Sequence, residues 1–219
     1  MKTSKAQAHD NRAHVVQTAS ALFRERGYDG VSVAELMAAA GFTHGGFYKQ
    51  FRSKADLMAE CAAGGMAQTV ALAAGIDRPA FVRSYLSRAH RDTRAAGCTL
   101  AALGADAARQ PKAVRAAFAQ GIECLLQALE KELPVLERAG PGAVLTAREA
   151  HAHAIDTLAH AVGAMVLSRA CPDDSPLADE ILSVCRDSML RMLAAQSPKP
   201  PKPPSRTRFV AAGHAPEPG

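Results

Sequence analysis

The spacing of hydrophobic residues along the chain is typical of amphipathic helices. Between residues 12 and 26, apolar side chains recur at intervals of three and four, with charged residues between them, and Gly27 follows the last turn. This spacing places the apolar residues on one helix face, and glycine commonly follows a helix end. No stretch alternates apolar and polar residues as a half-buried strand would. We therefore predict an all-α protein whose first helix spans residues 12–26.

Three further helix starts follow within a short stretch. Ser32 precedes an apolar run and has Glu35 three positions later, which is the pattern of a capping box, and Gly41 ends that run. Thr43 is the predicted N-cap of a third helix that runs to about residue 51, and Ser53 is the predicted N-cap of a fourth. Two short helices joined across a glycine have the layout of a helix-turn-helix, whose second helix enters the major groove of DNA.

The second of these short helices contains two adjacent glycines, Gly45 and Gly46, in its first turn. Glycine costs a helix about 1 kcal/mol relative to alanine. Residues that lower helix stability without a visible compensating gain are expected at functional sites. A helix whose first turn lacks side chains can also lie close against DNA. We therefore interpret the glycine pair as part of a DNA-binding surface.

The remaining helices are longer and are separated by proline or glycine. Apolar periodicity predicts them at about residues 79–95, 100–109, 111–132, 147–170 and 176–195. The chain is then divided into a disordered basic N-terminus (1–11), a helix-turn-helix domain (12–60), a larger helical domain (61–196) and a disordered, proline-rich basic tail (197–219). The tail is predicted to be disordered because proline cannot continue a helix and little there can be buried.

Composition narrows the class of protein. The chain has no Trp, carries a formal net charge of +5 and has five cysteines without a C-x-x-C pair, so reduced thiols in a cytoplasmic protein are expected. No leader or membrane-length apolar run is present, so no membrane association is predicted. His151 and His153 lie two positions apart and point to different helix faces, so no metal and no cofactor are predicted.

Residues 21–23, 27–33 and 40–57 closely resemble the DNA-binding region of TetR-family repressors. The family usually has histidine where this chain has Gln50, which places one backbone or phosphate contact in question. The resemblance implies a regulator, and not an enzyme, that binds palindromic double-stranded operator DNA as a homodimer. Carried over by position, it assigns DNA contact to Ser32, Val33, Thr43, His44, Gly45, Gly46, Tyr48, Lys49 and Lys54.

The resemblance also implies that the last two helices of each subunit form the dimer interface. The apolar stripe on these helices fits this role, although a core within one chain would give the same pattern. The predicted interface residues are Ile155, Leu158, Val162, Met165, Ile181, Cys185 and Met189.

The central helices are expected to bind a small-molecule effector that releases the protein from DNA, because helical bundles hold such sites between helices. Cys98 stands at a helix start, where a thiol can become reactive, and some TetR-type repressors that respond to electrophiles or oxidants resemble this segment. The alternative, which the residue type favours, is a small buried residue that fills space. The candidate effector residues are Phe81, Tyr85, Cys98, Leu103, Phe118 and Ile122.

Two alternatives from other classes of protein remain at this point. A helical thiol-based redox enzyme could use Cys98, but it would need a second thiol or an orienting acid at a workable spacing. An architectural DNA-binding protein without a ligand would suit the basic tail. The large domain after the motif argues against it, because DNA packing alone does not need such a domain.

Overall fold

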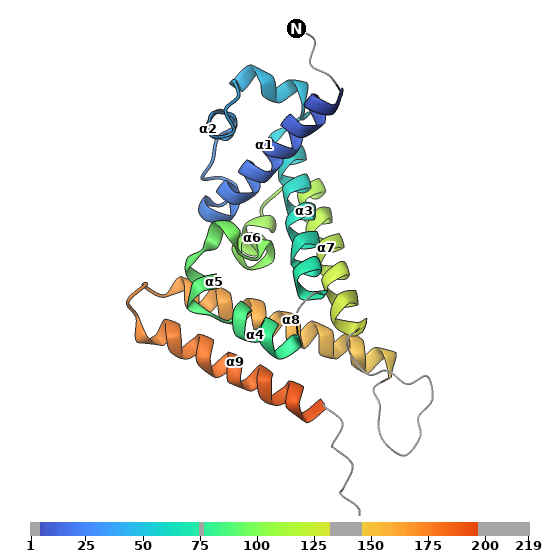
Figure 1. Ribbon diagram of the computed structural model, residues 1–219, viewed down its shortest axis with the longest axis vertical. Helices are drawn as coiled ribbons and strands as arrows, with labels where there is room; N and C mark the ends of the chain where they lie inside the picture. The colour runs from blue at the N-terminus through green and yellow to red at the C-terminus, as the bar shows by residue number, and fades with distance from the viewer. Residues whose placement is uncertain (1–4, 75–76, 132–145, 197–219) are drawn as a thin grey trace, which may run out of the picture.

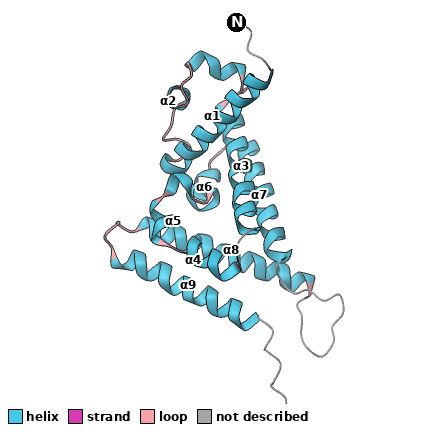
Figure 2. Cartoon of the chain, in the orientation of Figure 1, coloured by secondary structure: helices cyan, strands magenta, loops and turns pink. Residues whose placement is uncertain are grey.

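The computed structural model describes residues 5–74, 77–131 and 146–196, and this part of the chain contains helices and no strand (Figure 2). The all-α prediction is confirmed. In chain order the elements are α1 (Lys5–Arg26), α2 (Val33–Ala39), the 3-10 helix η1 (His44–Lys49), α3 (Lys54–Ala74), α4 (Arg78–Tyr85), α5 (Arg88–Asp92), the 3-10 helix η2 (Arg94–Ala96), α6 (Thr99–Ala107), α7 (Lys112–Lys131), α8 (Ala147–Ala170) and α9 (Pro176–Gln196).

The described helices form two groups at opposite ends of the molecule, and a pair of long helices connects the groups (Figure 1). Helices α1 and α2 and the 3-10 helix η1 gather at one end, while α8 and α9 lie across the other with α4 against them. Helices α3 and α7 run side by side between the two ends. Gly121 on α7 makes this close approach possible, because a β-carbon there would lie 2.0 Å from the sulfur of Met66 on α3.

Two apolar clusters stabilise the described helices. The first joins α1, α2, η1 and α3 to α6 and α7, and it includes Phe23, Phe47 and Phe118. The second joins α4, α6, α8 and α9 around Leu86 and Met165. Because α6 contributes to both clusters, the end that carries the helix-turn-helix is packed directly onto the larger helical part.

The first helix begins earlier than predicted. Residues 5–11, which were expected to be disordered, form the first turns of α1. Alanines at positions 6 and 8 favour a helix, and the Gln7 side chain donates a hydrogen bond to Asn11 one turn later. Residues 1–4 lie outside the described residues. The predicted end of this helix is confirmed, since Gly27 follows it with a φ of 77°.

The capping signals around α2 are confirmed in detail. The Ser32 hydroxyl accepts a hydrogen bond from the Glu35 amide, and the Glu35 carboxylate accepts one from the Ser32 amide. At the other end, Gly41 adopts a φ of 77° and the amide of Phe42 donates to the carbonyl of Met37. This is a Schellman motif, which uses a left-handed residue to satisfy the last carbonyls of the helix.

One predicted helix was wrong, and one helix crosses a predicted division. Helix α3 continues through Gly64 and Gly65, so it passes from the predicted helix-turn-helix domain (12–60) into the predicted larger domain. The helix predicted at residues 79–95 is broken into α4, α5 and η2, because the Ser87 hydroxyl accepts the amide of His90 and starts a new helix. The four other long helices agree with the prediction to within a few residues.

The predicted tail at residues 197–219 lies outside the described residues. Among the helices that the structure does describe, none combines the length and the apolar character needed to cross a lipid bilayer.

Candidate nucleic-acid interface and ligand cavity

The second short helix of the predicted motif is a 3-10 helix and not an α-helix. In η1 the amide of Gly46 donates to the carbonyl of Thr43, three residues back, at 2.9 Å. The predicted cap is also wrong in part, because the Thr43 hydroxyl makes no capping hydrogen bond. Two glycines in succession weaken α-helix propagation, which explains the tighter and shorter element.

The aromatic residues of η1 divide between the core and the surface. Phe47 is 0% exposed and stacks on Phe51 at 5.3 Å, whereas Tyr48 is 64% exposed. His44 and Lys49 are also exposed, and the His44 ring lies edge-on to Tyr48 at 6.0 Å. The buried pair fixes η1 to the small core and leaves His44, Tyr48 and Lys49 together on an accessible surface.

The glycines of η1 are not required by packing against the residues that the structure describes. A β-carbon on Gly45 would meet no atom within 4 Å, and one on Gly46 would make only ordinary contacts with Met37 and Thr43. Neither glycine is among the described glycines with positive φ. Neither backbone strain nor internal crowding in the described residues therefore requires glycine here, and the surface over Gly45 is open.

Two predicted DNA contacts are engaged elsewhere. The Lys54 ammonium donates to the carbonyl of Tyr28 and lies 5.9 Å from the Phe23 ring, so it is directed at its own chain. Val33 is half-buried and packs against the first apolar cluster. Ser32 remains exposed, but its hydroxyl is occupied by the capping bond to Glu35. The predicted contact residues that remain exposed and without a role inside the described chain are therefore mainly those of positions 43–49.

Sequence reasoning missed Arg12 as an anchor of this surface. Its guanidinium donates to the carbonyl of Gln50, pairs with Glu60 and lies 4.2 Å from the centroid of the Phe51 ring. Arg12 thereby ties α1 to the end of η1 and to α3. Its position on the polar face of the first helix carried no signal of this role, because surface arginines are common there.

A cavity of about 400 Å³ lies between the helices of the larger part. This volume is in the range of small-molecule sites, about 300–1,000 Å³. Side chains from α3, α4, α7, α8 and α9 and the residue before α6 form its wall. The described lining residues are Thr69, Val70, Arg78, Phe81, Val82, Tyr85, Cys98, Cys124, Leu125, Gln127, Ala128, Leu129, Lys131, Thr157, Leu158, Ala161 and Leu193.

Half of the predicted effector residues line this cavity. Phe81, Tyr85 and Cys98 do so, whereas Leu103 and Phe118 are buried in the first apolar cluster. Ile122 is half-buried and is not part of the lining. Helical periodicity did not separate these three from the lining residues, because it marks an apolar face without showing whether that face meets a core or a cavity.

A chain of polar contacts connects the cavity wall to the start of α6. The Nδ1 of His90 lies 2.7 Å from the carbonyl oxygen of Tyr85, and its Nε2 accepts the amide of Cys98 at 3.0 Å. A carbonyl can only accept a hydrogen bond, so the ring hydrogen lies on Nδ1. Because Nε2 accepts the Cys98 amide, it carries no hydrogen, and the imidazole of His90 is neutral. Burial lowers the pKa of His90, although the bond to Tyr85 opposes that shift.

Tyr85 and Cys98 present the main hydrogen-bonding groups deep in the cavity wall. Cys98 is 7% exposed and is the N-cap residue of α6, without a side-chain capping bond. The hydroxyl of Tyr85 is buried beside the Cys98 thiol. Burial raises the pKa of Tyr85 well above its ordinary value, and the neighbouring Cys98 thiol adds to that rise.

The predicted dimer stripe faces the inside of the chain. Met165 and Met189 are buried in the second apolar cluster, Val162, Ile181 and Cys185 pack partly against it, and Leu158 lines the cavity. Only Ile155 is exposed. Periodicity selected the inward face because α8 and α9 each carry apolar residues on an inward face and on an exposed face. The exposed face holds Ile155, Val166, Leu167, Leu177 and Val184.

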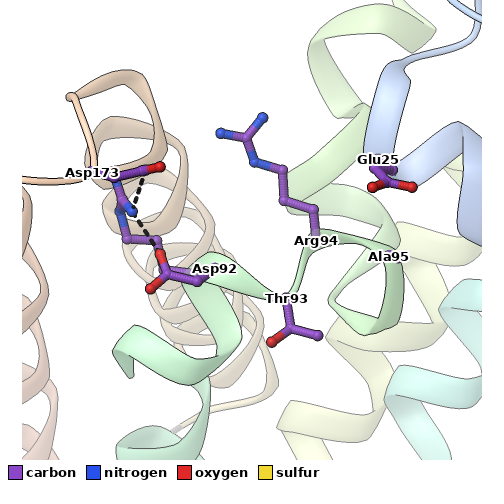
Figure 3. A pocket seen from close by; sticks show the side chains of 7 residues that line it. Glu25, Asp92, Thr93, Arg94, Ala95 and Asp173 are labelled. Atoms are coloured by element: carbon purple, nitrogen blue, oxygen red, sulfur yellow. Dashed lines mark hydrogen bonds and ion pairs between the residues drawn. The ribbon is translucent and has the colours of Figure 1, made fainter.

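A second, polar cavity of about 460 Å³ lies where α1 meets η2 and the turn between α8 and α9. Arg91 is 2% exposed and pairs with Asp92 and Asp173 at 2.6 and 2.9 Å, as the dashed lines of Figure 3 show. Arg94 lies between this pair and Glu25 of α1 (Figure 3). These contacts bind the C-terminal helices to the segment that adjoins α1.

A hydrogen bond links that segment to α1 itself. The Arg24 side chain donates from Nε to the carbonyl of Ala95 in η2 at 2.7 Å. Ala95 lies three residues before Cys98, whose amide is bound by His90. The wall of the apolar cavity and the first helix of the DNA-binding end are thus connected through one short segment.

The comparisons with known proteins agree at the N-terminus. Residues 15–61 match the family described as bacterial regulatory proteins, tetR family. The HTH-type transcriptional regulator AcrR of Shigella flexneri is 36% identical over 59 residues, which cover 27% of this chain and 27% of that protein. The match therefore spans about a quarter of the curated relative's length.

Solved structures share the overall fold over most of the chain. Reduced NemR of E. coli has a TM-score of 0.66 at 20% identity, covering 84% of this chain and 97% of that one. A regulator from Cytophaga hutchinsonii has a TM-score of 0.66 at 17% identity, with 91% and 100% covered. AibR, solved with isovaleryl coenzyme A and operator DNA, has a TM-score of 0.50 at 18% identity, with 83% and 97% covered.

Because these identities are low, the solved structures establish only the fold. The N-terminal match relates residues 15–61 to the tetR family. The family is a class of DNA-binding regulators and not of enzymes, as predicted, and the thiol-enzyme alternative is set aside. The N-terminal segment at residues 15–61 is that of the tetR family of bacterial regulatory proteins.

Proposed function

We propose that this protein is a transcriptional repressor that binds a palindromic operator as a homodimer and is released by a small molecule. The observation that carries the DNA-binding part is the surface of η1. His44, Tyr48 and Lys49 are exposed there, and Gly45 has open space where a side chain would be. Such a surface suits close contact with a phosphate backbone and with base edges.

The dimer is supported by the exposed apolar face of α8 and α9. Ile155, Leu167 and Val184 are 46%, 59% and 58% exposed, which is unusual for three large apolar residues on neighbouring helices. A dimer also has a functional reason, because one short helix reads few bases. Two copies on a twofold axis read half-sites about 34–36 Å apart, or a multiple of that distance. An operator target places the protein in the bacterial cytoplasm.

Release by a ligand is supported by the apolar cavity and by its connection to α1 through His90, Ala95 and Arg24. AibR, a structural neighbour, was solved with both isovaleryl coenzyme A and operator DNA. A ligand shifts the protein only if it prefers the conformation that does not fit the operator. A preference of about 100-fold contributes about 2.7 kcal/mol, which is enough to empty a moderately occupied site.

A second version of the sensor uses the thiol of Cys98, because that thiol lines the cavity. Cys124 also lines the cavity but is exposed, so it serves as a matched control. If Cys98 is the sensor, peroxide or iodoacetamide releases the wild type and the Cys124→Ser variant but not Cys98→Ser. If the cavity alone senses a ligand, Cys98→Ser responds like the wild type.

The central test is selection of bound fragments from sheared bacterial DNA by the full chain, followed by sequencing. We expect a palindromic consensus. Binding to it should weaken by about 10³–10⁵ between 50 and 200 mM salt if about 6–10 phosphates are contacted. An absence of any sequence preference over bulk DNA would contradict the repressor and favour the architectural alternative, and a flat salt response would contradict the assigned phosphate contacts.

A further inference from the structure

Arg12 joins three elements at the end of η1. Its guanidinium donates to the carbonyl of Gln50, the residue that closes η1, and it pairs with Glu60 on α3. The same group lies 4.2 Å from the centroid of the Phe51 ring. Because Arg12 itself belongs to α1, one side chain connects α1, η1 and α3.

The short helix η1 needs such support from outside. It has six residues, and two of them, Gly45 and Gly46, are glycines. Helices of the 3-10 type are uncommon beyond three or four residues, and glycine loses more conformational freedom on folding than any other residue. Carbonyls at the C-terminal end of a helix lack partners within that helix. Arg12 supplies a charged donor to one of them, the carbonyl of Gln50.

The charge of Arg12 is balanced within the chain. Two of its guanidinium nitrogens donate to Gln50 and Glu60. The side chains of Arg12 and Glu60 are 35% and 40% exposed, so a phosphate could reach the pair, but it would lie beside the Glu60 carboxylate and be repelled by it. The contacts of Arg12 therefore favour a role in holding η1 over a direct contact with DNA.

We propose that the Arg12–Glu60 pair positions η1 for operator recognition, so that His44, Tyr48 and Lys49 meet the DNA in one fixed orientation. This assignment rests on the proposed DNA-binding function and adds two positioning residues that make no contact with DNA themselves. It also predicts the sign of an effect. Removal of an acidic side chain near DNA ordinarily strengthens binding, because less negative charge faces the phosphates, but removal of Glu60 should weaken it.

The first test measures hydrogen exchange of the free full chain by mass spectrometry. Arg12→Gln should speed exchange in the η1 peptide about tenfold, because the Gln50 and Phe51 amides there donate to the carbonyl of Phe47. Exchange in α2 should not change. Arg26→Gln is the matched control, since Arg26 is an exposed arginine at the other end of α1. Unchanged exchange in η1, or an equal rise in α2, would overturn the proposal.

The second test measures affinity for the selected operator by fluorescence anisotropy. An exposed ion pair is worth up to about fivefold, and a dimer carries the change twice, so Glu60→Ala should weaken binding about 4- to 25-fold. Asp10→Ala is the matched control. Asp10 is an exposed acidic residue in the first turns of α1, and its removal should leave binding equal or tighter. If Glu60→Ala binds as tightly as the wild type or more tightly, the pair does not position η1.

A third variant separates the geometry of Arg12 from its charge. Lysine keeps the positive charge but lacks the planar fork, so it cannot bind the Gln50 carbonyl and the Glu60 carboxylate as arginine does. Arg12→Lys and Arg12→Gln should therefore both weaken operator binding at least about tenfold. Wild-type affinity of Arg12→Lys would contradict the proposal. The exchange measurement needs no DNA, so a protein that selects no operator would overturn the proposed repressor function, while exchange still decides whether Arg12 holds η1.

Discussion

Adjacent aromatic residues in η1 should respond in opposite ways to truncation. Tyr48 is 64% exposed, and Phe47 beside it is 0% exposed. Full burial of a large apolar side chain stabilises a protein by about 1.5–3 kcal/mol, so the buried third of Tyr48 contributes about 0.5–1 kcal/mol. Phe47→Ala should instead lower the free energy of unfolding by about 3–5 kcal/mol, because it opens a hole in the small core.

Operator binding should show the reverse order of sensitivity. A hydrogen bond to a charged group is worth about 1.5–3 kcal/mol. A dimer loses one from each half-site when Tyr48 is replaced, so Tyr48→Ala should weaken binding by about 10²- to 10⁴-fold. Tyr48→Phe removes only the hydroxyl and should produce most of this loss. The assays are chemical denaturation for stability and a fluorescence-anisotropy titration of the selected operator for affinity.

Two outcomes would contradict the assignment of Tyr48 to the DNA-binding surface. If Tyr48→Ala lowers the unfolding free energy by as much as Phe47→Ala, then Tyr48 is part of the core. If Tyr48→Phe binds the operator as tightly as the wild type, then the phenol makes no phosphate contact and η1 recognises DNA by other groups.

Three further predictions concern other parts of the chain. Gly45→Leu should abolish operator binding with little change in stability, because a side chain there has open space within the protein. Gly121→Ala should lower the unfolding free energy by about 1–3 kcal/mol through a clash with Met66, and the loss should be smaller in a Met66→Ala background; equal losses would show that the clash is relieved elsewhere. The depressed pKa of His90 means that the unfolded chain takes up a proton first, so stability should fall as pH drops below about 6.5. His90→Gln should flatten that dependence in denaturation curves, and an unchanged slope would assign it to other groups.

Local sequence signals determined where α2 begins and ends. The capping box of Ser32 and Glu35 and the left-handed turn at Gly41 are each set by residues a few positions apart. Such short-range bonds depend little on distant parts of the chain, which explains why they could be read directly. The exception is η1, where the neighbouring glycines changed the helix type.

Tertiary packing decided what the larger part does with its apolar faces. Phe118 and Tyr85 both lie on helical stripes, yet one is in a core and the other in a cavity wall, because that depends on which helix each stripe meets. Met165 likewise faces inward, while Val166 beside it is exposed. Periodicity determines that a face is apolar, since it needs only the 3.6-residue repeat. Whether that face meets its own chain, a ligand or a second subunit depends on contacts between residues far apart in sequence, which the sequence pattern alone does not contain.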